Sequence, residues 1–288
     1  MARRNLLPWL LMAAPSVWLA IFFVAPLALM AFYSLRPNME GGLFAWGWQP
    51  TLSNYRTILQ GESYLPLLWV SIRVALVVAF CATLLSYPLA YFLVFRARLR
   101  APLLLTLLIL PFWTSYLLRI ISWKVILGSN GVINSLLTYI GLVDQPVPLL
   151  IYSRLAVVVT LVYVWLPFVA LPIYAALQRI DASLLEAATI LGAPRWLAFL
   201  RVTFPLSLPG VIAGFFMVFI PTVGEFVTPL LVGGSRGALY GNLIEIFFGD
   251  GINWPLGSAL AFIMLGGVLV VVAIAVKLLR VDRLLEEQ

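Results

Sequence analysis

Long apolar runs alternate with short polar segments along the whole chain. A helix rises about 1.5 Å per residue, so roughly 20 apolar residues are needed to cross about 30 Å of bilayer hydrocarbon. Six runs reach that length. The pattern therefore predicts an all-α membrane protein in which residues 1–288 form a single transmembrane domain with six transmembrane helices. The expected spans are about 9–34, 66–94, 102–127, 150–177, 205–231 and 256–278.

Composition supports this class, and the positive residues give it an orientation. The chain is 63% hydrophobic and only 10% charged, which is typical of polytopic membrane proteins. Its lysines and arginines cluster in alternate connections, and such connections are usually cytoplasmic. We expect both termini to be cytoplasmic, and we attribute the net charge of +7 to this asymmetry and to contact with anionic membrane lipid, not to nucleic acid. The clustered residues are Arg3, Arg4, Arg96, Arg98, Arg100, Arg179, Arg195, Arg201, Lys277, Arg280 and Arg283.

The residues that usually carry catalytic or metal chemistry are nearly missing. Cys81 is the only cysteine and there is no histidine, so one chain forms neither a disulfide nor a Cys/His metal site. The sequence also lacks a GxxxxGK[ST] phosphate cradle. We therefore expect no catalytic residue, no metal and no cofactor, and any ATP that drives transport must be bound by another subunit.

A polar segment at about 179–204 separates the fourth and fifth apolar runs. Asp181 is a candidate helix N-cap, and Gly192 is a candidate C′ residue that ends the helix. Pro194 can open a second short helix at its first position. The segment is thus expected to form two short cytoplasmic helices joined by a turn, with Glu186 and Arg195 available outside the apolar stripe.

The fifth apolar run contains four prolines, three glycines and a carboxylate, Glu225. Such a helix is expected to kink, and an unpaired carboxylate within a membrane costs at least several kcal/mol. Glu225 should therefore face a cavity or a partner. Two interpretations remain open: Glu225 binds a cation, or it forms a structural ion pair with Arg73 or Arg119.

Aromatic and basic residues surround these spans without deciding between the interpretations. Some aromatic side chains are candidate walls for cation–π contact with a solute, although simple packing explains each one equally. Three basic residues, Arg73, Arg119 and Lys124, could snorkel, pair with carboxylates, or line an anion-accepting vestibule. The candidate aromatic residues are Trp113, Tyr116, Trp165 and Phe226.

The outer connections are expected to contain short interfacial elements. Asn130-Gly131 is a turn signal followed by an amphipathic stretch, and a cluster of apolar residues lies between turn formers near 243–248. Each is expected to form a short helix. Trp46 and Trp48 in the first outer connection are candidate interfacial anchors.

The segment from Glu186 resembles the EAA motif of permease subunits of bacterial ABC importers. It has Glu186-Ala187-Ala188, then Gly192 at the expected spacing, then an apolar, proline-containing run. Longer stretches resemble the spermidine/putrescine branch of these permeases, and this resemblance covers nearly the whole chain. Those stretches are YPLAYFL from Tyr87, LPFWTSYLLRIISWKVIL from Leu110, NGVINSLL from Asn130 and PTVGEFVTPLLVGG from Pro221.

The resemblance implies a type I ABC importer permease fold whose cytoplasmic EAA helices couple to ATPase subunits. Glu186 would then be an acidic docking residue, Ala187 and Ala188 a small contact surface, Gly192 the turn and Arg195 a further coupling residue. The expected partners are a dimer of ABC ATPase subunits, a second and homologous permease subunit, and a periplasmic binding protein. The expected location is the bacterial inner membrane.

The leading hypothesis is therefore a translocation subunit, not an enzyme, that imports putrescine or spermidine by alternating access. The acidic position in the fifth span, Glu225, would bind the polycation. One alternative keeps the same importer but another small organic solute, in view of the basic residues. A second, an ion-coupled secondary transporter, is less favoured because we find no convincing inverted repeat, and a non-transporting scaffold is disfavoured by the kinked, charged fifth span.

Overall fold

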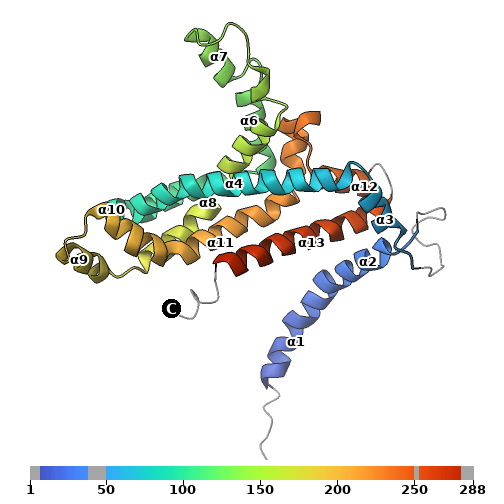
Figure 1. Cartoon of the computed structure of the whole chain (residues 1–288), viewed down its shortest axis with the longest axis horizontal. Helices are drawn as coiled ribbons and strands as arrows, with labels where there is room; N and C mark the ends of the chain where they lie inside the picture. The colour runs from blue at the N-terminus through green and yellow to red at the C-terminus, as the bar shows by residue number, and fades with distance from the viewer. Residues whose placement is uncertain (1–6, 38–49, 250–252, 280–288) are drawn as a thin grey trace, which may run out of the picture. The chain divides into compact units, whose positions relative to one another are not determined.

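The computed structural model describes residues 7–37, 50–249 and 253–279, and in these ranges it consists of helices and short connections (Figure 1). Six helical stretches in the described residues are long and apolar enough to cross a membrane, as the hydrophobic pattern predicts. The predicted anchors Trp46 and Trp48, and the basic residues Arg3, Arg4, Arg280 and Arg283, lie outside the described residues. The six stretches are Pro15–Ser34, Tyr64–Ala97, Tyr116–Tyr139, Arg154–Gln178, Arg195–Val223 and Trp254–Lys277.

The third apolar run differs from the single span that its hydrophobicity predicts. The structure divides it into α5 (Ala101–Ile109), the 3-10 turn η4 (Leu110–Trp113) and α6 (Tyr116–Leu127). Pro111 has no N–H to donate, and Thr114 and Ser115 adopt extended ψ angles of 152° and 139°. The candidate third span consequently begins at Tyr116 and continues to Tyr139.

Contacts within the chain define two compact units, which are described separately: residues 1–65 with 243–266, and residues 66–242 with 267–288. The first unit contains α1 (Leu7–Leu19), α2 (Ala25–Ser34) and α3 (Ser53–Gln60). Buried Asn54 on α3 donates from its amide nitrogen to the carbonyls of Ser34 (3.0 Å) and Arg36 (2.6 Å). This side chain joins α3 to the end of α2.

The second unit is organised around α4 (Tyr64–Phe92), α8 (Arg154–Gln178) and α11 (Phe204–Val223). Helices α8 and α11 pack along each other closely because two glycines of α11 face α8. A Cβ on Gly210 would lie 2.5 Å from the carbonyl oxygen of Pro172, and one on Gly214 would lie 3.1 Å from that of Val169. Ser86 of α4 adds a hydrogen bond of 2.9 Å to the carbonyl of Leu166 on α8.

Two short helices occur where the outer connections predict them. They are α7 (Val132–Tyr139) and α12 (Tyr240–Phe248), and α12 precedes the last helix, α13 (Trp254–Leu279). The polar segment forms α9 (Ala182–Ile190) and α10 (Arg195–Ala198). The remaining elements are the π-helical turns η1 (Ala20–Val24), η2 (Leu93–Ala97), η6 (Phe199–Thr203) and η7 (Pro229–Gly233), and the 3-10 turns η3 (Arg98–Arg100), η5 (Pro148–Leu150) and η8 (Ser235–Gly237).

Candidate functional site

The fifth span is interrupted at the position of Glu225. Helix α11 ends at Val223, residues 224–226 are not helical, and the helix resumes at Val227 before the π-helical turn η7. Glu225 Oε1 accepts hydrogen bonds from the backbone N–H groups of Val227 and Thr228, both at 3.0 Å. The carboxylate therefore caps the second helical segment, since these N–H groups have no partner within the helix. The predicted kink is thus a complete break.

The other carboxylate oxygen of Glu225 is bound by Tyr116, the first residue of α6. The Tyr116 hydroxyl donates to Glu225 Oε2 at 2.9 Å and lies 2.9 Å from Thr228 Oγ1. This contact joins residues 109 positions apart in the sequence. The carboxylate is consequently held at both oxygens, and its orientation is fixed by the third and fifth spans together.

Helix α12 closes over the same break. The side-chain amide of Asn242 donates to the carbonyl of Phe226 at 2.8 Å, and its oxygen accepts from the N–H of Leu239 at 3.0 Å. A Cβ on Gly241 would lie 2.5 Å from the carbonyl oxygen of Gly224. Only glycine permits this approach, and the backbone groups released by the break gain partners from α12.

The basic residues contact aromatic rings and not the carboxylate of Glu225. The guanidinium of Arg119 lies 4.5 Å from the ring centroid of Phe112, and that of Arg73 lies 5.7 Å from Trp69. Lys124 Nζ lies 6.0 Å from the ring of Tyr152. Among the described residues, the polar partners of Glu225 are the hydroxyl of Tyr116 and two backbone N–H groups, so the structure favours a helix cap over an ion pair.

The predicted aromatic residues fall into two groups. Tyr116 and Phe226 adjoin Glu225, and the side chain of Phe226 is 40% exposed. Trp113 lines a pocket of about 290 Å³ together with Phe112 and Phe168, and Trp165 lies 5.4 Å from the ring of Phe168. The structure thus brings Tyr116 and Phe226 to the carboxylate, whereas Trp113 and Trp165 gather near Phe168.

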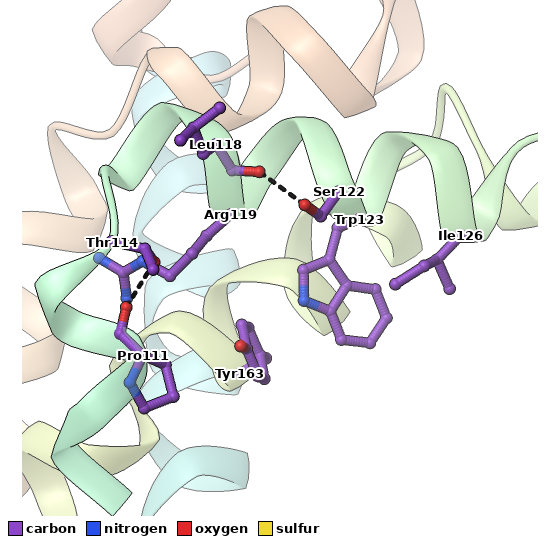
Figure 2. Close-up of a pocket in the computed structure, with 8 residues that line it drawn as sticks. All are labelled: Pro111, Thr114, Leu118, Arg119, Ser122, Trp123, Ile126 and Tyr163. Atoms are coloured by element: carbon purple, nitrogen blue, oxygen red, sulfur yellow. Dashed lines mark hydrogen bonds between the residues drawn. The ribbon is translucent and has the colours of Figure 1, made fainter.

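A second pocket, of about 390 Å³, opens between α6 and α8 (Figure 2). Arg119 lines it, and this residue is only 9% exposed. Its Nε atom is buried without a hydrogen-bond partner. The other lining residues are Pro111, Thr114, Leu118, Ser122, Trp123, Ile126 and Tyr163.

The polar segment between the fourth and fifth spans has the local structure that its sequence predicts. Asp181 Oδ1 accepts from the N–H of Ser183 at 2.9 Å, which caps α9 and holds the pKa of Asp181 below its usual range. At the other end Gly192 has φ +78°, and the Gly192 and Ala193 N–H groups donate to the carbonyls of Thr189 and Ala188, both at 3.0 Å. This bonding pattern is a Schellman motif. Pro194 is the N-cap of α10, one position earlier than predicted.

The outward side of these two helices is unusually apolar. Helix α9 buries none of its residues, Ile190 and Leu191 are each 86% exposed, and Trp196 of α10 is 64% exposed. Glu186 and Arg195, the predicted coupling residues, are also exposed. Exposed apolar residues beside charged ones are typical of a surface that binds another protein.

Comparisons with known proteins assign the chain to a family. Residues 6–287 match the family described as "Binding-protein-dependent transport system inner membrane component". The chain belongs to this family. It is therefore a multi-pass inner-membrane protein and a permease subunit of an ABC importer.

Relatives and a solved structure support the same assignment. The permease is 39% identical to the spermidine/putrescine transport system permease protein PotB of Escherichia coli K12, over 73% of this chain and 75% of the relative. It is 37% identical to PotB of Haemophilus influenzae, over 85% and 84%. It also has the fold of a chain in a bacterial alginate ABC transporter in complex with alginate pentasaccharide-bound periplasmic protein, with TM-score 0.72, 18% identity, and 94% and 93% of the chains covered.

Sequence reasoning missed several residues of the site in this permease. Thr228 and Asn242 complete the network around Glu225, and Phe112 receives the guanidinium of Arg119. Their signals were weak, since a threonine in an apolar run and an asparagine in an outer connection are common. Gly241, one residue before Asn242, was the one local indication of a close backbone approach.

Proposed function

We propose that this permease imports polyamines, putrescine or spermidine, by ATP-driven alternating access. The observation that carries the proposal is Glu225, a carboxylate within a membrane span that is oriented by three hydrogen bonds and flanked by the rings of Tyr116 and Phe226. A polyamine is a flexible polycation, and a fixed carboxylate with aromatic faces attracts an ammonium group. The names of the relatives at 37–39% identity agree with this solute class.

The interrupted fifth span suits the movement that alternating access requires. Its first half continues directly from α10 through the π-helical turn η6, and the break at 224–226 separates this half from η7. Movement of α9 and α10 would therefore be transmitted to α11, while α12 and Tyr116 hold the outer segment. Helix breaks of this kind commonly adjoin the solute sites of transporters.

We propose that α9 and α10 bind the ATPase subunits on the cytoplasmic side, with both termini on that side. Glu186, Ala187, Ala188 and Arg195 would make the contacts, and Gly192 would set the angle between the two helices. The exposed Leu191 and Trp196 supply the apolar part of the interface. A second, homologous permease subunit and a periplasmic binding protein complete the proposed assembly.

The test is reconstitution of the permease with its ATPase, partner permease and binding protein in lipid vesicles. We expect the binding protein to bind putrescine or spermidine, and we expect uptake of the labelled polyamine to require ATP. A binding protein that ignores both polyamines but retains another organic solute would overturn the polyamine assignment. Uptake that continues without ATP but stops when the proton gradient is dissipated would instead support ion-coupled transport.

A further inference from the structure

The pocket beside Arg119 has features that the import of a polycation does not use. The chain places a guanidinium within a membrane span, 9% exposed, with its Nε buried and lacking a hydrogen-bond partner. Its described contacts are the faces of two rings, Phe112 at 4.5 Å and Tyr116 at 5.8 Å. An aromatic face attracts the charge but accepts none of the directional hydrogen bonds that a guanidinium offers.

Two further donors line the same pocket. Trp123 and Tyr163 lie with their ring centroids 5.4 Å apart, and Figure 2 shows both side chains at the pocket with Arg119. No hydrogen bond joins the indole N–H or this hydroxyl to another described residue. The hydroxyls of Thr114 and Ser122 instead donate to the backbone carbonyls of Pro111 and Leu118. Three donor groups therefore remain available in the described part of this pocket.

The depth of the guanidinium narrows the source of its ligand. Arg119 precedes the last residue of α6, Leu127, by eight positions, which is about 12 Å along the helix axis. Its guanidinium is turned towards Phe112, further from that end. A lipid phosphate lies outside the roughly 30 Å of hydrocarbon, so this depth favours a small molecule that enters the pocket.

We propose that this pocket is a binding site for an oxyanionic group, a carboxylate, phosphate or phosphonate, carried on a small organic molecule. Arg119 forms the charged contact, Trp123 and Tyr163 donate further hydrogen bonds, and Leu118 and Ile126 receive the apolar part. The volume of about 390 Å³ fits such a ligand. The site lies beyond the proposed function, because a polyamine carries no oxyanion and the carboxylate of Glu225 meets the opposite, hydroxyl end of Tyr116.

The experiment measures binding of phenylphosphonate to the complete, purified transporter complex by saturation-transfer NMR of the phenyl protons, with benzyl alcohol as the neutral probe. We expect phenylphosphonate to bind and benzyl alcohol to bind much more weakly. Arg119→Gln should weaken phenylphosphonate binding by about tenfold or more, since a charge-assisted contact is lost. Tyr163→Phe should weaken it less, and Arg73→Gln, which removes an exposed guanidinium, should leave it unchanged.

Three outcomes would overturn the proposal. The first is no binding to the complete complex, whatever fills the pocket. The second is equal binding by wild type and Arg119→Gln, with Arg119→Lys as the charge-retaining control for variants that assemble poorly. The third is binding in alkyl maltoside micelles that disappears in phospholipid nanodiscs, because lipid phosphate would then be the occupant. Polyamine uptake is measured separately, so failure of either proposal is recognised without the other.

Discussion

Glu225 has two separable duties, and Glu225→Gln distinguishes between them. The amide oxygen of a glutamine still accepts from the N–H groups of Val227 and Thr228, and its NH₂ group donates to the hydroxyl of Tyr116. The helix cap is preserved while the negative charge is removed. Glu225→Ala removes both. We expect both variants to lose polyamine transport, but only the alanine variant to lose stability.

The size of each effect follows from the geometry. An ammonium group 4 Å from the carboxylate is attracted by about 4 kcal/mol at an effective dielectric constant of about 20. The carboxylate is partly exposed and shares its charge with three donors, so we expect about 1.4 to 4 kcal/mol, or about a 10- to 1000-fold loss of apparent solute affinity. Loss of the cap in Glu225→Ala should lower the free energy of unfolding by about 0.5–2 kcal/mol.

The assay combines two measurements on the same purified complexes. Labelled putrescine uptake into vesicles gives the apparent affinity, and thermal unfolding gives the stability of each variant relative to wild type. Wild-type uptake by Glu225→Gln would refute a charge-based role and leave the cap as its sole duty. A glutamine variant as unstable as the alanine variant would refute the hydrogen-bond reasoning, because the amide retains each contact.

Three other substitutions test the coupling segment and the break. Glu186→Ala and Gly192→Ala should lower solute-stimulated ATP hydrolysis while membrane insertion stays normal; at Gly192, with φ +78°, alanine costs about 1–2 kcal/mol. Gly241→Ala should destabilise the complex by about 1–3 kcal/mol because its Cβ meets backbone at 2.5 Å, whereas Gly267→Ala, with its nearest atom at 3.5 Å, should be neutral in thermal unfolding. The pKa of Asp181 is lowered in the fold, so its cap should be fully formed above about pH 4 and lost as pH falls further; amide exchange of α9 should show this, and Asp181→Asn should abolish the pH dependence.

The local features of this permease were predictable because their partners are close in sequence. The cap at Asp181 and the turn at Gly192 each use hydrogen bonds within five residues, so their residue types alone indicate the geometry. The spans follow from hydrophobicity. The division of the third run was available in principle at Pro111, but an apolar average does not register the loss of one N–H.

The network around Glu225 was beyond the reach of the pattern. Tyr116 and Glu225 are 109 positions apart, and Asn242 contacts Phe226 across a connection whose path the sequence does not specify. Arg73 and Arg119 were reasonable partners by charge, but packing places each guanidinium on an aromatic ring. Distances between spans depend on helix rotation, and a hydrophobic run on every face leaves that rotation undetermined.

The break at 224–226 also limits how solute selectivity can evolve in this permease. Any replacement at Glu225 has to keep accepting the N–H groups of Val227 and Thr228, or the second helical segment loses its start. Aspartate, asparagine, serine and threonine meet this requirement, as does glutamine, whereas arginine and lysine offer no acceptor. A lineage that changes cargo from cation to anion therefore cannot simply reverse the charge here, and must recruit its positive group from a neighbouring position.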